Sequence, residues 1–250
     1  MARAAFQELR RRVALARRAQ PPGVPQPALR LLLGEAGTRV ENWRARRRAE
    51  PGWLAPAAQP RAVMLVPGFA THPVRMHRLR RGLEAAGHRV SDWGLGWNLG
   101  ASPDTLAAFA ERVAEQAARE GEPLALVGWS LGGIFAREAA RLHPHAVRLV
   151  VTMGTPFSGD FHANNVWRAY HLIAGHDVAD PPLPGDLAAK PPVPTVALWS
   201  ARDGIVHHRA ARGRPGERDA AVALRCTHLG FAGHPQAIAE VLRQIARADG

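Results

Sequence analysis

A five-residue motif near the middle of the chain restricts the folds that the chain can adopt. Residues 128–132 read Gly-Trp-Ser-Leu-Gly and match the pattern Gly-x-Ser-x-Gly, with an apolar run at 124–127 before them and a helix-like stretch at 134–142 after them. A serine on a sharp strand-to-helix turn takes a strained backbone conformation that presents its hydroxyl at the edge of a sheet. Glycines on either side avoid collisions with the adjoining strand and helix. This context predicts that Ser130 is a nucleophile.

From residue 61 onward the chain alternates between short apolar runs and helix-like stretches. We expect strands at 62–66, 88–92, 124–127, 147–153, 195–199 and 222–224. We expect helices at 75–86, 103–119, 134–142 and 235–246. Helical crossovers between continuously apolar strands indicate an α/β fold, with a mostly parallel sheet of about six strands covered by helices on both faces. Ligands bind such sheets at the carboxyl ends of the strands.

The first 60 residues differ from the rest of the chain. Apolar residues recur at helical spacing over 4–19 and over about 28–49, and a proline-rich stretch at 21–27 separates the two. Residues 51–60 resemble a linker. We therefore expect a helical N-terminal extension with its linker at 1–60, followed by the α/β domain at 61–250.

The net charge of +12 is concentrated in this extension, because residues 1–50 carry 12 Arg and 4 Glu. Arginine supplies all but one of the 33 basic residues, which points to a compositional bias rather than to a shaped binding patch. No zinc-finger, helix-turn-helix or RNA-recognition pattern accompanies the charge, so we expect no nucleic-acid partner. The basic helix at 4–19 is a candidate for weak peripheral contact with a membrane surface.

Cysteine content and hydropathy exclude other classes of protein. The single cysteine, Cys226, excludes an intramolecular disulfide and a cysteine metal cluster. No run of about 18 apolar residues is present to span a membrane, and the N-terminus has no signal-peptide apolar core. We therefore expect a cytoplasmic location.

Three further segments, together with the serine motif, carry a resemblance to a known family. Residues 154–159 read Gly-Thr-Pro-Phe-Ser-Gly, residues 200–206 read Ser-Ala-Arg-Asp-Gly-Ile-Val, and residues 227–231 read Thr-His-Leu-Gly-Phe. With these segments, residues 61–248 resemble an α/β-hydrolase of the esterase/lipase-like kind. The order Ser130, Asp203, His228 is the order that this fold requires.

The resemblance implies a role for each of these residues. Serine is a weak nucleophile that needs an adjacent base, so His228 would accept its proton and Asp203 would orient the imidazole. The backbone N–H groups of Leu131 and Phe69 would form the oxyanion hole. Many relatives have His-Gly where this chain has Pro-Gly at 67–68, which leaves the geometry of that hole open.

Other residues compete for two of these roles. His234 is an alternative base, and His207 and His208 follow Asp203 in a variable loop. Asp160 is the main alternative acid, because some hydrolases carry the acid one strand earlier, and Asp177 and Asp180 lie in a more variable region. No His-Glu-x-x-His or comparable spacing is present, so we expect no metal site and no cofactor.

Residues 157–192 contain no clear strand and several prolines, and we expect a small cap over the pocket there, with a short helix at about 164–174. The candidate substrate-binding residues are Trp129, Trp97, Trp167 and Tyr170. The alternative for Trp97 is a place in the core, and for Trp167 and Tyr170 a role in anchoring the cap segment.

These observations predict a serine hydrolase that cleaves carboxylic esters with an apolar acyl group through an acyl-enzyme. The same triad can transfer the acyl group to an alcohol or cleave a thioester, and both remain open. A non-catalytic binding module is a further alternative, although such scaffolds usually lose one member of the triad. The expected partner is a small-molecule ester, and the sequence does not predict an oligomeric state.

Overall fold

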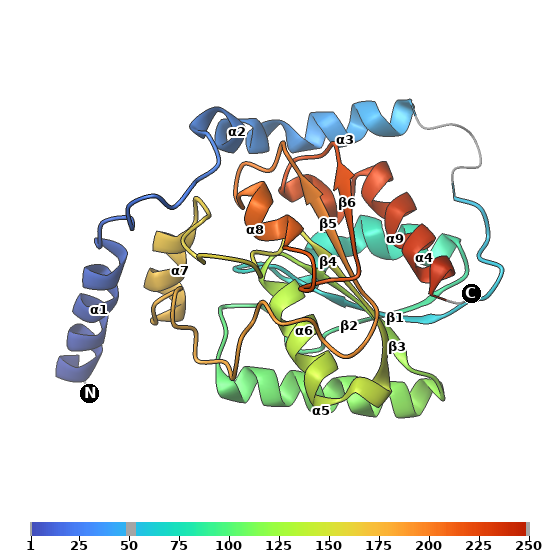
Figure 1. Ribbon diagram of the computed structural model, residues 1–250, viewed down its shortest axis with the longest axis horizontal. Coiled ribbons are helices and arrows are strands. Elements are labelled where there is room, and N and C mark those ends of the chain that lie inside the picture. Colours follow the sequence, from blue (N-terminus) through green and yellow to red (C-terminus); the bar gives the residue numbers. More distant parts are fainter. Residues whose placement is uncertain (1, 49–53, 249–250) are drawn as a thin grey trace.

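Six parallel strands form one sheet in the computed structural model, which describes residues 2–48 and 54–248 (Figure 1). The strands are β1 (Ala62–Val66), β2 (Arg89–Asp92), β3 (Leu124–Trp129), β4 (Val147–Met153), β5 (Thr195–Ser200) and β6 (Ala220–Leu224). Their order across the sheet is β2-β1-β3-β4-β5-β6. Every neighbouring pair is parallel, so the predicted sheet is confirmed.

The central strands are apolar along their whole length because both faces of the sheet are covered. All residues of β1 and β3 are buried. Successive side chains of a strand point to opposite faces, so Val63 and Leu65 of β1 belong to one core cluster and Met64 and Val66 to the other. This is the pattern that distinguishes a buried parallel strand from the half-exposed strand of an antiparallel sheet.

Two pairs of helices cover the sheet (Figure 1). One face packs against α4 (His77–Ala85) and α9 (Pro235–Arg247), and the other against α5 (Pro103–Glu120) and α6 (Leu131–Leu142). The start of α5 is capped by Ser102, whose Oγ accepts a hydrogen bond from the N–H of Thr105 at 3.1 Å.

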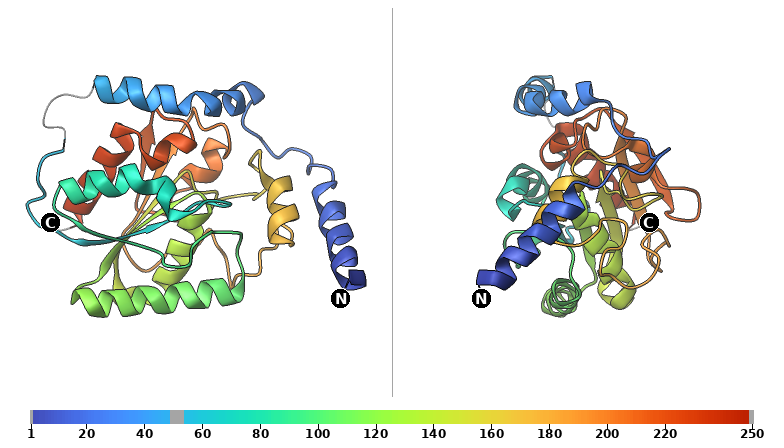
Figure 2. Two further views of the ribbon diagram at one scale, coloured as in Figure 1. Left: turned by 180° about the vertical axis from the view of Figure 1, so that it is seen from behind. Right: turned by 90° about the vertical axis from the view of Figure 1, so that its left-hand side faces the viewer.

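The N-terminal extension packs against the α/β domain in two places (Figures 1 and 2). Helix α1 (Ala2–Ala16) lies beside α7 (Trp167–Ala174), where the Arg12 side chain donates to the carbonyl of Ile173 at 2.7 Å and Arg11 donates to that of Gly175 at 2.5 Å. These arginines satisfy carbonyl groups at the C-terminal end of α7, which have no partner within the helix.

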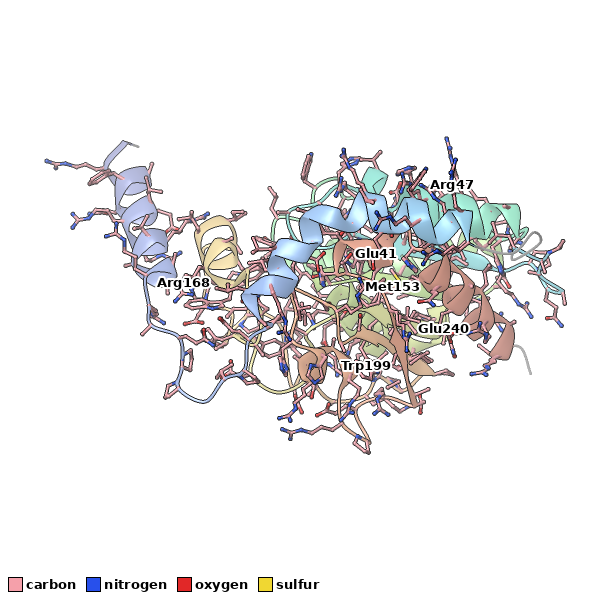
Figure 3. The ribbon with its side chains drawn as sticks, turned by 90° about the horizontal axis from the view of Figure 1, so that it is seen from above. Glu41, Arg47, Met153, Arg168, Trp199 and Glu240 are labelled. Atoms are coloured by element: carbon pink, nitrogen blue, oxygen red, sulfur yellow. The ribbon has the colours of Figure 1, made fainter. Side chains whose placement is uncertain are left out.

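The second part of the extension lies across the C-terminal half of the domain (Figures 1 and 3). It consists of α2 (Leu29–Gly34), the 3₁₀ turn η1 (Glu35–Gly37) and α3 (Thr38–Arg47), and α3 contacts α9. The sequence predicts one helix over 28–49, of which residue 49 lies outside the described residues. The structure instead has a tighter turn between two α-helices, bounded by Gly34 and Gly37, whose low helix propensity permits the break.

Several short elements carry no periodic signal and were not predicted from the sequence. They are η2 (Pro73–Met76), η3 (Pro144–Ala146), α8 (His208–Arg212) and η4 (Leu229–Ala232). Within the described ranges, no helix is both long enough and apolar enough to cross a membrane.

Candidate active site

Ser130 lies on the sharp turn between β3 and α6. Its backbone has φ 53° and ψ −125°, and the positive φ is unusual for a residue with a side chain. The N–H of Ser130 donates to the carbonyl of Met153, at the end of β4, at 2.8 Å. The predicted strained conformation is therefore present, and a hydrogen bond to the neighbouring strand holds it.

The glycines of the motif are required by close backbone approaches. A Cβ on Gly132 would lie 2.3 Å from the carbonyl oxygen of Val66, and a Cβ on Gly128 would lie 2.4 Å from the Cα of Gly133. Both neighbours are backbone atoms that cannot rotate away. Any other residue at these positions would separate β1, β3 and α6, and would displace the serine between them.

Asp203 follows β5 and is held by its own loop. Its Oδ1 accepts hydrogen bonds from the N–H groups of Ile205 at 2.9 Å and Val206 at 2.7 Å. Its Oδ2 accepts from Nδ1 of His228 at 2.8 Å. Both side chains are buried, so water does not compete with this hydrogen bond.

His228 follows β6 and precedes η4. Burial lowers the pKa of His228, but the charge of Asp203, its hydrogen bond to the ring and the charge of Glu35 outweigh burial and raise the pKa above 6.5. Since Nδ1–H is bound to Asp203, the other ring nitrogen, Nε2, is the one left to exchange a proton. This is the orientation that a general base beside a serine needs.

Two contacts bring His228 to the same edge of the sheet as Ser130. The indole Nε1–H of Trp129, the residue before the serine, donates to the carbonyl of His228 at 3.1 Å. A Cβ on Gly154, the residue after Met153, would lie 3.0 Å from both Asp203 Oδ2 and His228 Nδ1. Among the described residues Ser130 Oγ and His228 share no hydrogen bond, and such bonds commonly tighten only when substrate binds.

The loop that carries Phe69 is held by Asn98. The fully buried side chain of Asn98 donates to the carbonyl of Pro67 at 2.8 Å, and its backbone carbonyl accepts from the N–H of Ala70 at 2.7 Å. Ala70 has a positive φ of 52°, so the loop is strained as well as fixed. Leu131 is the first residue of α6, where the N–H has no partner within the helix. In the sequence Asn98 follows the second strand, which places it at this edge of the sheet, and its only other signal is that it is a polar residue in an apolar, tryptophan-rich stretch.

A small apolar cavity of about 60 Å³ opens at Ser130. Its lining consists of Phe69, Ala101, Ser130, Leu131, Ile134, Pro156, Phe161, Asn164, Val166, Tyr170, Val178, Pro181, Leu183, Leu187 and Val206. More than half of these residues come from the segment 157–192, which therefore forms much of the wall of the cavity beside the serine. The rings of Phe69 and Tyr170 lie 4.9 Å apart, and burial raises the pKa of Tyr170 to about 12, so its hydroxyl stays neutral.

Of the four predicted substrate-binding side chains, the structure places only Tyr170 on this cavity. Trp129 is buried in the core under the α4 and α9 face, because strand alternation turns it away from Ser130. Trp167 is buried against the rings of His162 and His171 inside the segment that it anchors. Trp97 is 61% exposed and touches the ring of His72.

The alternative acids and bases have other partners in the structure. His234 caps α9 by accepting from the N–H of Gln236, and His207 caps α8 in the same way. Asp160 bonds to His162 at 2.9 Å and Asp177 pairs with Arg18 at 2.6 Å. His208 stacks on Trp199 with ring centroids 6.0 Å apart, and the N–H of Asp180 donates to the carbonyl of Asp177.

One group of side chains has the composition of a metal site. His162, His171 and Asp177 each place a donor atom within 4.8 Å of the others. However, His171 Nε2 accepts from the N–H of Val178 at 2.9 Å, and His171 Nδ1 bonds to the carbonyl of Leu15 at 3.1 Å. Both nitrogens of His171 are therefore engaged in holding α1 and the cap segment, which leaves no free lone pair on this ring for a metal.

A groove larger than this cavity lies outside the site. It has a volume of about 1070 Å³ and runs between α2–α3 and the start of α9, with Arg30, Arg44, Arg48, Arg202 and Arg225 along it. None of Ser130, Asp203 and His228 lines it.

Comparison with known proteins agrees with this architecture. A family model described as the alpha/beta hydrolase fold matches residues 61–182. A pyrethroid hydrolase, PytH, has a similar structure, with a TM-score of 0.55 and 17% identity over 76% of this chain and 99% of that one. A pyrethroid hydrolase from Sphingobium faniae JZ-2 gives a TM-score of 0.53 and 16% identity over 76% of this chain and 98% of that one.

One sequence relative is a pimeloyl-[acyl-carrier protein] methyl ester esterase of Klebsiella pneumoniae (strain 342). It is 40% identical over 68 residues, which are 27% of this chain and only 25% of the relative. Together with the sheet topology, these findings show that the chain has the α/β-hydrolase fold and is similar to esterases.

Proposed function

We propose that this chain, which has the α/β-hydrolase fold, is a serine hydrolase that cleaves carboxylic esters with an apolar acyl group through an acyl-enzyme. The observation that carries the proposal is the buried 2.8 Å hydrogen bond between Asp203 and His228, next to a serine on a strained turn. A buried carboxylate that fixes one nitrogen of an imidazole leaves the other nitrogen to act as a base.

In the first half of the reaction, Ser130 Oγ attacks the carbonyl carbon of the ester. His228 Nε2 takes the hydroxyl proton, and the negative charge of Asp203 stabilises the imidazolium that forms. The carbonyl oxygen becomes an oxyanion, for which the N–H groups of Leu131 and Phe69 are the donors. His228 then gives its proton to the leaving alcohol, and the acyl group remains on Ser130.

In the second half, water attacks the acyl-enzyme. His228 takes a proton from this water, the same two N–H groups hold the second oxyanion, and the acid leaves as the proton returns to Ser130. The reaction needs no group beyond the chain and water.

The lining of the cavity supports an apolar substrate. Apart from Ser130, Asn164 and Tyr170, its side chains are aliphatic, aromatic or proline. About 60 Å³ is the space of roughly two water molecules, so the acyl group is small or the cap segment moves to admit it. By name, the sequence relative is a methyl ester esterase and the structural neighbour PytH is a pyrethroid hydrolase, in line with this class of reaction.

The test is covalent labelling of the purified protein with a fluorophosphonate, followed by peptide mass spectrometry and assays with p-nitrophenyl esters. We expect labelling at Ser130, and we expect Ser130→Ala to lower kcat by roughly 10⁶-fold, because the nucleophile cannot be replaced. Ser91→Ala, on the edge strand β2, is the matched control and should keep both labelling and activity. Hydrolysis that persists in Ser130→Ala would overturn the proposal.

A further inference from the structure

A carboxylate from the N-terminal extension reaches the loops of the candidate triad. Glu35, on η1, is only 6% exposed. Its Oε1 accepts hydrogen bonds from the N–H groups of Gly204 at 2.9 Å and His228 at 2.8 Å. Its Oε2 accepts from the N–H of Leu229 at 2.9 Å. Both oxygens therefore act as acceptors, and one side chain joins two loops that follow different strands.

The three donors are placed where they set the geometry of the Asp203–His228 pair. Gly204 is the residue after Asp203, and the other two donors are His228 itself and the residue that follows it. Without Glu35 these buried N–H groups would lose their acceptor, at a cost that proteins rarely tolerate. Glu35 thus accepts hydrogen bonds from the backbone of two loops at the same time: the acid loop after β5, which carries Asp203, and the histidine loop after β6, which carries His228.

The close approach of the extension is built into the sequence of the acid loop. A Cβ on Gly204 would lie 2.3 Å from the backbone oxygen of Leu31 in α2. Only glycine therefore lets the loop after β5 and the N-terminal extension meet there. Around this point Thr38 Oγ1 bonds to Thr227 Oγ1 at 2.7 Å, and Glu41 pairs with Arg202 at 2.8 Å. The extension is docked against both loops by several contacts, and Glu35 is the one at their centre.

We propose that Glu35 is a positioning residue of the active site, which holds the loops of Asp203 and His228 in register and adds a second negative charge behind the imidazole. This inference rests on the proposed function for its consequence in catalysis, but the three hydrogen bonds do not depend on it. The N-terminal extension is then part of the catalytic domain rather than an appendage to it.

The charge of Glu35 acts on a small set of buried groups. The ionisable groups that act on the His228 ring are Asp203 and Glu35, and both raise its pKa against the effect of burial. Cys226 lies in the same region, where burial and the charges of Asp203, Glu41 and Glu35 raise its pKa and Arg202 opposes them. Glu41 is among the charges that raise the pKa of Cys226 but not among those that raise the pKa of His228, and this separates it from Glu35.

The experiment compares Glu35→Gln, Glu35→Asp and Glu41→Gln in the full-length protein. Glu35→Gln keeps the size of the side chain but removes its charge and places an amide NH₂ against one backbone N–H. We expect kcat/KM to fall roughly 10- to 100-fold, as for other small displacements of a catalytic group. We also expect the acidic limb of the pH profile to move to lower pH, because the imidazole loses a neighbouring negative charge.

Two comparisons separate positioning from general damage to the fold. Glu35→Asp keeps the charge but shortens the reach, so its limb should stay near that of the wild type while its kcat/KM is reduced. Glu41→Gln makes the same chemical change on the same extension, and its limb should not move. Acid unfolding of a destabilised variant would move the limb to higher pH, opposite to the expected shift, so instability of a variant cannot imitate the result.

NMR titration of the His228 ring, assigned with His228→Gln, gives a readout that needs no substrate. The pKa of the ring should be lower in Glu35→Gln than in Glu41→Gln and the wild type. Equal titration and equal kcat/KM in Glu35→Gln and the wild type would overturn the inference, as would an equal shift in Glu41→Gln. Loss of the proposed function would appear differently, as wild-type protein that neither labels at Ser130 nor cleaves esters while the titration still reports on Glu35.

Discussion

At the scale of single residues, the candidate site depends on buried hydrogen bonds between side chains and backbone rather than on side chains alone. Asp203 has one oxygen on its own loop and the other on His228, so its position and that of the ring are set together. Asn98 holds the loop of Phe69 in the same manner. Each loop is therefore fixed before any substrate arrives, which is how a site avoids reorganisation during the reaction.

The Asp203–His228 pair makes the activity depend on pH in a defined direction. His228 must be neutral to act as a base, and its raised pKa moves the acidic limb of kcat/KM to higher pH than an unshifted imidazole would give. In Asp203→Asn the charge is lost and the ring is no longer held in the required tautomer. We expect kcat to fall about 10⁴-fold and the limb to move to lower pH, measured from pH 5 to 9.

Asp160→Asn is the control for this variant, because Asp160 bonds to His162 and not to the triad. The kcat of Asp160→Asn and the acidic limb of its pH profile should match those of the wild type. Loss of activity in Asp160→Asn together with retained activity in Asp203→Asn would return the acid role to Asp160, the alternative that the sequence left open.

At the scale of elements, the segment 157–192 forms much of the wall of the cavity beside the serine. The segment is anchored at α7, where Trp167 packs between His162 and His171, and its later residues form one wall of the cavity. The short helix predicted at about 164–174 is present as α7. The cap function itself remains a prediction, which a change in the volume of the wall can test.

Leu183→Ala removes volume from that wall and should admit a longer acyl chain. We expect the ratio of kcat/KM for p-nitrophenyl hexanoate over acetate to rise about 10-fold, the usual effect of a few methylene groups in an apolar site. Leu172→Ala is the control, since Leu172 lies on α7 but does not line the cavity. An unchanged ratio in Leu183→Ala would mean that the acyl group binds elsewhere.

At the scale of the whole molecule, the N-terminal extension lies on two sides of the domain: α1 lies beside α7, and α2 and α3 lie along another side (Figure 2). Helix α1 packs against α7 through its later residues, but Phe6 is 61% exposed and Leu9 is 54% exposed. The net charge of +12 adds a long-range attraction to anionic surfaces. The predicted membrane contact of this helix is thus open to test without disturbing the docked part of α1.

We expect the full-length protein to sediment with phosphatidylserine vesicles at low salt and to be released as salt rises, because basic residues near such a surface each contribute about 1 kcal/mol and salt screens them. Phe6→Ser combined with Leu9→Ser should weaken this binding, whereas Val74→Ser combined with Leu99→Ser, an equally exposed apolar pair, should not. Equal sedimentation of both double variants would contradict a role for α1.

Local sequence patterns are enough to predict the α/β fold and the positions of its strands along the chain. Those features follow from local patterns: continuous apolar runs for buried parallel strands, helical periodicity between them and the glycine-flanked turn at Ser130. The same patterns predict the edge of the sheet at which Asp203 and His228 lie, since each follows a strand.

Tertiary structure alone decided which side chains surround that edge. Trp129, Trp97 and Trp167 do not line the cavity: Trp129 and Trp167 are buried elsewhere, in the core and in the segment 157–192, and Trp97 is exposed. In the sequence, Glu35 is one of four acidic residues among the 12 Arg of residues 1–50. Its three hydrogen bonds join residues 169 to 194 positions apart. A periodic sequence pattern cannot predict such contacts, because they depend on how the extension folds back onto loops that come much later in the chain.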